Sequence, residues 1–177
     1  LLHMIPETRA KFIVEKYHRS YPGVRLWHNT VKTKIKQDRI LTNLMGRKRR
    51  FFGRLDDSLF KEGYAFIPQS TVADIINERG ILSIWECLDY EEIILLNQVH
   101  DSIVFEIPYS DREHCYKQLL RIKEVLETPL LARGRQFIIP AELKIGKRLG
   151  FAKKCSLKSF DTFTKTLDEV LDATAQG

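Results

Sequence analysis

Two short apolar runs with a polar stretch between them constrain the fold of this 177-residue chain more than any other feature. The runs cover residues 93–96 and 103–107, and the segment between them reads Asn-Gln-Val-His-Asp-Ser. Runs of this length around a polar turn are typical of a β-hairpin with its polar groups at the tip. Because several helical segments accompany this hairpin, the sequence predicts an α+β fold rather than βαβ winding.

Helical spacing of apolar residues predicts most of the remaining elements. Helices are expected from Glu7 to the Pro22-Gly23 pair, after that pair with Val24, Trp27, Val31 and Ile35 inward, from about Ser70 to Leu88 after Pro68, from Ser110 to Glu127, and from Ser159. The first helix is expected to bury a stripe made by Ala10, Ile13, Val14, Tyr17 and Tyr21. The third has two apolar faces that do not coincide, so it is either buried on both sides or broken near Gly80. The fourth begins with a Ser-Asp-Arg-Glu capping box and has an apolar stripe of Cys115, Leu119, Ile122 and Leu126. A strand is expected over residues 137–146, and the last helix has an apolar face of Phe160, Phe163, Leu167 and Val170.

Basic residues are concentrated in one segment of the chain. Residues 25–54 contain ten Lys or Arg and one acidic residue, a formal charge of +9, whereas the whole chain has +6 and a pI near 9.2. Such a patch raises the affinity and association rate for a phosphate backbone. Extended segments at 40–44 and 50–52 flank a turn at Gly46, so the arginines are expected on a hairpin-like projection. The same string also fits a solvated turn or a nuclear localisation signal.

Composition excludes several other classes of protein. The longest uncharged apolar run has four residues, far short of the roughly 20 that cross a bilayer, and no signal peptide opens the chain. Cys87, Cys115 and Cys155 are odd in number and lack CxxC spacing, which argues against a disulfide framework or a zinc knuckle. We therefore expect a reduced, intracellular protein, cytoplasmic or nucleoid-associated, with no membrane partner.

Five segments resemble the C-terminal part of the family A, or DNA polymerase I type, DNA-dependent DNA polymerases, and they occur in family order. They are Tyr21-Pro22-Gly23-Val24, the stretch from Leu41 to Arg49 (LTNLMGRKR), the stretch from Gln69 to Ile76 (QSTVADII), Gln98-Val99-His100-Asp101-Ser102 with Phe105-Glu106, and Ile145-Gly146-Lys147. Their order over roughly residues 7–150 makes a chance resemblance improbable.

The resemblance implies a palm with part of the fingers over residues 1–150, including an antiparallel hairpin and a last palm strand, and a helical extension over residues 151–177. Asp101 would hold the Mg²⁺ pair for attack of a primer 3′-hydroxyl on the α-phosphate of a deoxynucleoside triphosphate. His100 and Gln69 would face the minor-groove side of the primer terminus. The phosphates of primer-template DNA would be gripped by Arg47, Lys48, Arg49 and Arg50.

The chain departs from the family pattern in three places. Ser102 stands where the family has glutamate, Ser70 replaces a glycine, and Pro68 is shifted, which suggests a divergent, phage-like branch. The first metal-binding aspartate and the nucleotide-binding helix are expected upstream of residue 1. We therefore expect an upstream polymerase half as partner, and a chain that binds primer-template weakly but is inactive by itself.

Two other functions compete with this interpretation. A non-catalytic nucleic-acid-binding module would keep the basic hairpin and use Asp101 only as a turn residue. A metal-dependent phosphohydrolase with a His-Asp pair would place that pair on a helix with further histidines. Here the pair lies between two strand-like runs, and His3, His18, His28 and His114 show no ligand spacing. The phosphohydrolase is therefore the weakest of the alternatives.

Overall fold

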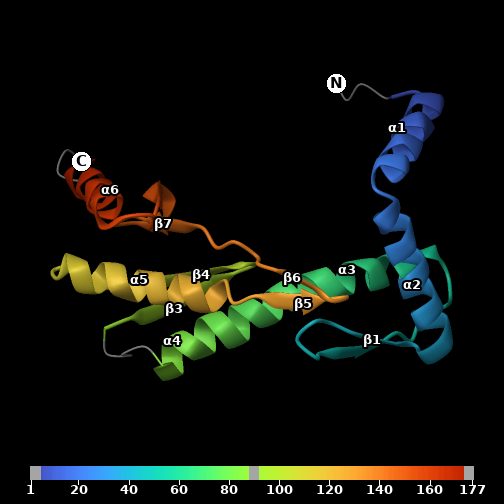
Figure 1. Cartoon of the computed structure of the whole chain (residues 1–177), viewed down its shortest axis with the longest axis horizontal. Coiled ribbons are helices and arrows are strands. Elements are labelled where there is room, and N and C mark those ends of the chain that lie inside the picture. The colour runs from blue at the N-terminus through green and yellow to red at the C-terminus, as the bar shows by residue number, and fades with distance from the viewer. Residues whose placement is uncertain (1–4, 88–91, 174–177) are drawn as a thin grey trace. The chain divides into compact units, whose positions relative to one another are not determined.

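The computed structural model describes residues 5–87 and 92–173, and the chain divides into two compact units, Leu1–Thr71 and Val72–Gly177 (Figure 1). Helices and two-stranded antiparallel sheets occur in both units, so the predicted α+β class is confirmed. Among the described residues, no helix is both long enough and apolar enough to span a membrane.

The first unit is built from helices and one hairpin. Helix α1 spans Glu7–Ser20 and α2 spans Pro22–Asp38; the hairpin strands are β1, Ile40–Thr42, and β2, Lys48–Arg50. Helix α3, Asp57–Asp74, begins in this unit and ends in the next. The core of the unit consists of Val31, Ile35, Leu41, Phe51, Leu59, Phe60 and Phe66. The strands of the hairpin therefore close the core that α2 and α3 form.

The expected burial of the α1 stripe is wrong. The helix forms where predicted, but none of its residues is buried, and Phe12, Ile13, Val14 and Tyr17 are 48–65% exposed. Tyr17 packs against Tyr21, with ring centroids 5.1 Å apart. Helical spacing fixes which residues share a face, but burial of that face also needs an element that covers it, and the described part of the first unit provides none.

Helix α3 starts about thirteen residues earlier than expected, so Pro68 lies inside the helix rather than before it. It continues into η1, a π-helix at Ile75–Ile81, and then into α4, Leu82–Cys87. The chain does not break at Gly80. The wider π-turns shift the angular position of the following residues, which explains why the two apolar faces do not coincide. The predicted end at Leu88 lies outside the described residues.

The second unit contains the predicted apolar hairpin. Strands β3, Ile94–Val99, and β4, Ser102–Glu106, pair antiparallel and pack on η1 and on α5, Arg112–Leu126 (Figure 1). A Cβ on Gly80 would lie 2.2 Å from Ile103 Cδ1, so glycine allows this close packing. The shared core consists of Ile84, Ile93 and Ile122, with Leu95, Ile103, Phe105, Ile107 and Leu126 partly buried against it.

Helix α5 begins one residue later than its predicted capping box. Its N-cap is Asp111, whose Oδ1 accepts a hydrogen bond from the His114 backbone N–H at 2.9 Å. The box at Ser110 is therefore wrong, because the neighbouring carboxylate satisfies the free N–H group instead. The predicted inward stripe is confirmed: Cys115, Leu119 and Ile122 are buried.

The predicted strand at 137–146 is divided in two. Strand β6, Arg135–Phe137, pairs with β5, Leu130–Ala132, whereas β7, Leu143–Ile145, pairs with β8, Lys153–Cys155. A short 3₁₀ turn, η2, Leu149–Phe151, lies between β7 and β8. Helix α6, Phe160–Ala173, follows; of its predicted apolar face, Phe163, Leu167 and Val170 are buried, whereas Phe160 is exposed.

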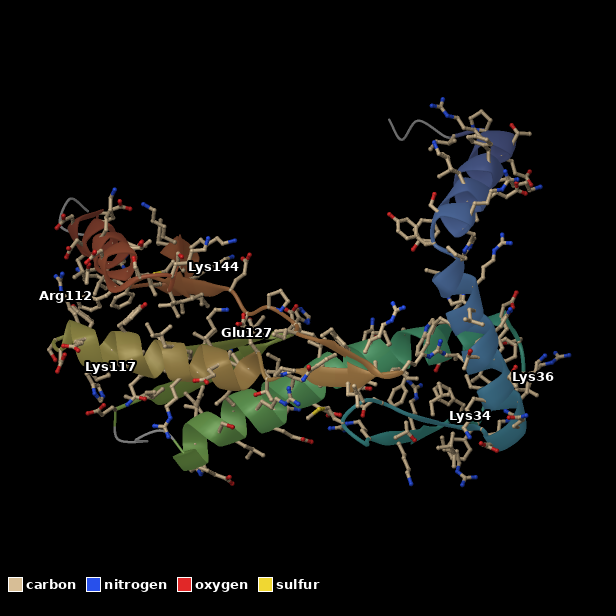
Figure 2. The ribbon with its side chains drawn as sticks, in the orientation of Figure 1. Lys34, Lys36, Arg112, Lys117, Glu127 and Lys144 are labelled. Atoms are coloured by element: carbon tan, nitrogen blue, oxygen red, sulfur yellow. The ribbon has the colours of Figure 1, made fainter. Side chains whose placement is uncertain are left out.

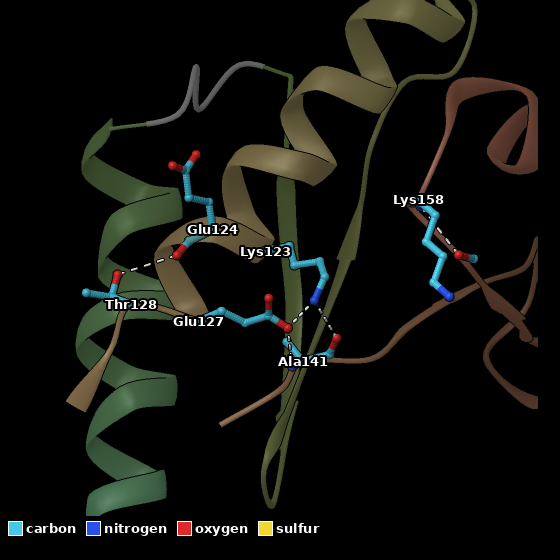
Figure 3. A network of polar contacts seen from close by, with 7 residues as sticks. Lys123, Glu124, Glu127, Thr128, Ala141 and Lys158 are labelled. Atoms are coloured by element: carbon cyan, nitrogen blue, oxygen red, sulfur yellow. Dashed lines mark hydrogen bonds and ion pairs between the residues drawn. The ribbon is translucent and has the colours of Figure 1, made fainter. Parts of the chain in front are cut away.

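The segment before β7 is held against the end of α5 by a polar network (Figure 3). Glu127 Oε1 accepts a hydrogen bond from the Ala141 N–H at 2.8 Å and another from Lys123, which also donates to the Ala141 carbonyl at 3.2 Å. Partial burial by itself would raise the pKa of Glu127, but these hydrogen bonds and the lysine charge outweigh it and lower the pKa below 4.5. The Glu127 carboxylate therefore holds the segment around Ala141, which leads into β7, against the end of α5.

Candidate nucleic-acid interface and metal-binding hairpin

The basic hairpin presents its cationic side chains on two different faces. In β2, Arg49 pairs with Leu41 and shares a strand face with Phe51, and both apolar side chains are buried. Because successive side chains alternate across a strand, Lys48 and Arg50 lie on the opposite, exposed face. All four predicted phosphate ligands, Arg47, Lys48, Arg49 and Arg50, are at least partly solvent-accessible, but only part of the set projects outward.

Arg49 is engaged within the first unit. Its guanidinium forms an ion pair with Glu62 at 2.6 Å and lies over the Phe51 ring, 4.8 Å from the ring centroid. Lys48 and Arg50, in contrast, form no ion pair with any described residue. The structure thus separates one arginine that packs on the core from two cations that are available to a ligand.

A buried asparagine holds the tip of this hairpin. Asn43 is 5% exposed, and its Oδ1 accepts hydrogen bonds from the backbone N–H groups of Met45 and Arg47 at 3.0 and 2.9 Å. An asparagine side chain that bonds to the backbone two residues ahead is a common way to build a turn. Gly46 follows with φ of +90°, in the region that glycine adopts without steric cost.

The same asparagine ties the turn to α3. Its Nδ2 donates to Ser70 Oγ at 3.0 Å, and the Leu44 N–H donates to Thr71 Oγ1 at 3.3 Å. Gln69 is exposed on the helix next to these two residues. Gln69 therefore precedes, on α3, the two residues to which the arginine-rich turn is hydrogen-bonded. The structure also gives Ser70, which replaces a family glycine, a hydrogen-bonding role.

Sequence reasoning missed two residues of this surface. Asn43 was identified only as part of a motif, although an asparagine shortly before a turn glycine is a recognisable turn signal. Phe52 follows Arg50 at the end of the outward face and is 85% exposed, the highest value among the large apolar side chains of the described residues. Alternation along the strand could have shown that Phe52 shares a face with Lys48 and Arg50.

Lysines of α2 extend the basic surface of the first unit (Figure 2). Lys34 pairs with Asp38 one turn later, while Lys36 lies over the Phe60 ring at 5.8 Å from its centroid. Lys32 lies over the same ring at 5.4 Å. Lys32 and Lys36 thus place their side chains over Phe60 and keep their charges at the surface, where Lys32 also pairs with Asp57 at 3.9 Å.

The second hairpin turns through only two residues, His100 and Asp101. Val99 pairs directly with Ser102, and His100 has φ of +52°, in the left-handed region that histidine enters more readily than most residues. His100 and Asp101 are both exposed. Polar ties near the tip are few: Ser102 Oγ donates to the Val99 carbonyl at 2.8 Å, and Gln98 Nε2 donates to Asn77 Oδ1 at 3.0 Å.

Asp101 is an exposed carboxylate and does not belong to a described metal-binding cluster. Within residues 5–87 and 92–173, no three His, Cys, Asp or Glu side chains lie together as a metal-binding group. Gln69 and the arginines belong to the first unit, whereas His100 and Asp101 belong to the second. The cationic turn is therefore a feature of the first unit, and the exposed Asp101 carboxylate is a feature of the second.

Comparison with known proteins covers most of the chain. Residues 2–149 match DNA polymerase family A. DNA polymerase I of Helicobacter pylori strain J99 is 28% identical over 124 residues, which are 67% of this chain and 14% of the relative. The thermostable DNA polymerase I of Thermus aquaticus is 26% identical over 151 residues, or 80% of this chain and 17% of that protein. The chain thus spans about a sixth or less of these relatives, and it belongs to DNA polymerase family A.

Proposed function

We propose that this chain supplies the primer-template surface and one metal-binding carboxylate of a DNA-directed DNA polymerase. The observation that carries the proposal is the exposed Asp101 at the tip of an antiparallel hairpin, inside the region that matches DNA polymerase family A. The substrates would be primer-template DNA and deoxynucleoside triphosphates. We further propose that residues 1–150 form the palm with part of the fingers and that residues 151–177 are a C-terminal extension; the extension contains strand β8 as well as helix α6, so the expectation of a purely helical extension is wrong.

Contacts to the DNA would be divided between the two units. In the first, Arg47, Lys48 and Arg50 would bind phosphates, which position a duplex without reading its sequence. Gln69, next to the helix residues that anchor the turn, would donate to minor-groove acceptors, which the base pairs share. In the second, His100 would contact the primer terminus beside Asp101. Arg49, held by Glu62, would act mainly by supporting the strand.

The chemistry of Asp101 fits a hard divalent cation. Mg²⁺ is bound by one or two carboxylates and keeps several waters, so a single exposed aspartate can provide part of such a site. When bound, Mg²⁺ would act as a Lewis acid at the reacting phosphate. A second carboxylate is needed to complete a two-metal site, and we propose that it comes from an upstream polymerase half, which also brings the nucleotide-binding helix.

A non-catalytic nucleic-acid-binding module is the second candidate. The serine at position 102, in place of the family's glutamate, and the lack of a described three-residue metal-binding group favour it. Such a module would bind DNA through the basic hairpin with an affinity that does not depend on Asp101 or on Mg²⁺.

Primer extension distinguishes the two functions. The chain is combined with a separately expressed segment that carries the first metal-binding aspartate and the nucleotide-binding helix, and extension is measured with Mg²⁺ and nucleotides. We expect Asp101→Asn to lower the extension rate about 1000-fold, because it removes a ligand that contributes several kcal/mol. Primer-template affinity should change by less than about twofold.

The control is Asp161→Asn, which removes another exposed aspartate of the second unit, in the first turn of α6. It should leave extension unchanged. Full activity of Asp101→Asn would reject the catalytic proposal and leave the binding module. Extension by the chain alone would contradict the need for an upstream half.

A further inference from the structure

The loop between β7 and β8, residues 146–152, presents the two most exposed large apolar side chains in the described part of the second unit. Phe151 is 78% exposed and Leu149 is 71% exposed, and both belong to the short turn η2. The family match ends at residue 149, within this loop. None of the functions proposed above uses these side chains.

Strands β7 and β8, which flank the loop, are packed against the rest of the second unit. Strands β7 and β8 pair in register, and a Cβ on Gly146 would lie 2.9 Å from Ala152 Cα, so the two arms of the loop close directly on each other. At the foot of the hairpin, Cys155 is buried in the core formed with α5 and α6. Tyr116 donates a hydrogen bond to the Leu157 carbonyl at 3.0 Å. The paired strands and the core below them therefore hold the apolar tip at the surface.

The surroundings of the loop are basic. Residues 143–160 contain six Lys or Arg and no acidic residue. Two of these charges are neutralised, because Lys153 pairs with Glu169 and Lys154 pairs with Glu142. Lys144, labelled in Figure 2, and Arg148 form no ion pair with any described residue. Two available cations thus stand close in sequence to an exposed phenylalanine and an exposed leucine.

We propose that the β7–β8 loop binds single-stranded nucleic acid. An exposed aromatic ring gives a base a stacking surface, and neighbouring basic residues attract the phosphates on either side of it. In this site Phe151 stacks on a base, Leu149 packs beside it, and Arg148 and Lys144 contact the backbone. The excess of positive charge that remains after these two ion pairs favours a polyanion over a neutral or basic protein surface as the occupant.

The test measures the affinity of the whole chain for a fluorescent 16-nucleotide oligothymidine by anisotropy. All variants are made in a chain that carries Lys48→Ala and Arg50→Ala, so that a failure of the basic hairpin cannot affect the result. We expect Phe151→Ala to weaken binding about tenfold. Arg148→Ala should weaken it about threefold and reduce the salt slope by about 0.7.

Two variants in the same unit are the matched controls. Tyr109→Ala removes an aromatic ring that is 47% exposed but lies near Asp111 in the sequence rather than near basic residues. Arg121→Ala removes an exposed cation on α5. Both should bind oligothymidine within about twofold of the parent. A photo-crosslink from 5-iodouracil should map to residues 147–152.

Three results would overturn the proposal. The first is oligothymidine binding by Phe151→Ala that equals the parent. The second is a loss of oligothymidine affinity in Phe151→Ala that is no larger than the loss in Tyr109→Ala. Such a result would show that the effect is not specific to the β7–β8 loop. The third is unchanged binding together with reduced self-association in sedimentation velocity, which would identify the loop as a contact between copies of the chain.

Discussion

The two hairpins that carry the predicted site residues are stabilised in opposite ways. The tip of β1–β2 is tied to α3 through the buried Asn43 and its hydrogen bonds to Ser70 and to the turn backbone. The tip of β3–β4 has few polar ties, and its position is set by apolar packing of the strands on η1 and α5. Hydrogen bonds thus hold the tip of the cationic β1–β2 turn. The tip that carries Asp101 is instead held through the apolar packing of strands β3 and β4.

The units that contain these hairpins also differ in charge. Residues 1–71 have fifteen basic and six acidic residues, a formal charge of +9, whereas residues 72–177 have fourteen basic and seventeen acidic residues, a charge of −3. Long-range attraction of a polyanion therefore resides in the first unit. Three sets of substitutions test these differences in how the hairpins are stabilised and in how charge is distributed.

Removing the amide of Asn43 should have the largest effect. Asn43→Ala leaves the Met45 and Arg47 N–H groups and Ser70 without their partner, so we expect a loss of about 2–3 kcal/mol in unfolding free energy. Urea unfolding measures the loss, and hydrogen exchange should show faster exchange at both amides. Asn97→Ala, an exposed asparagine of β3, should cost less than about 0.5 kcal/mol. Equal losses would remove the distinction between the hairpins.

Removing the outward cations should have an intermediate effect. Lys48→Ala with Arg50→Ala should weaken duplex binding about tenfold and lower the salt slope by about 1.8, because two phosphate contacts disappear. Arg49→Ala is the matched control, since its guanidinium is held by Glu62 and Phe51. Salt-dependent anisotropy gives the slopes. A slope change from Arg49→Ala as large as that of the double variant would show that all faces of the strand bind DNA.

Neutralising Glu127 should have the smallest effect, and one that depends on pH. Because its pKa is lowered on folding, the ionised carboxylate stabilises the second unit above pH 4.5 and loses this contribution as the pH falls through its folded pKa. Glu127→Gln should therefore cost about 1 kcal/mol at pH 7 and progressively less below pH 4.5. Urea unfolding from pH 7 to pH 3 measures this.

Two controls accompany the Glu127 measurement. Glu124→Gln, an exposed neighbour on the same helix, should cost little at any pH. The loss from Asn43→Ala should stay constant over the range, because an amide does not titrate. A pH-independent loss for Glu127→Gln would show that its charge does not support the segment before β7.

Much of the fold was predictable because its signals are local. Extended segments around polar or glycine turns located both hairpins, and helical spacing identified the buried residues of α5 and all but Phe160 of the apolar face of α6. The capping residue of α5 and the start of α3 were not predictable at this level. Two neighbouring side chains, Ser110 and Asp111, can both cap a helix, and a proline can end one helix or lie within another.

The candidate site was predictable as a set of residues but not as an arrangement. The sequence placed Asp101 at a turn and the arginines on a projecting hairpin; the structure has Asp101 at the β3–β4 turn, but it puts Lys48, Arg49 and Arg50 in strand β2, where Arg49 is held by Glu62 and Phe51. The sequence did not show that Asn43 ties the turn to α3, because that contact depends on Ser70, 27 residues later in the chain. Nor did it separate Arg49 from Lys48 and Arg50, although Phe51 two residues away was an available signal.

The sequence by itself determined the elements, their amphipathic faces, the segregation of charge and the membership of DNA polymerase family A. Only the tertiary structure decided which faces are covered: the stripe of α1 stays exposed, while Gly80 is packed beneath Ile103. The physical reason is that periodicity depends on neighbours along the chain. Burial and hydrogen bonding depend on elements that are distant in sequence and meet only in the folded protein.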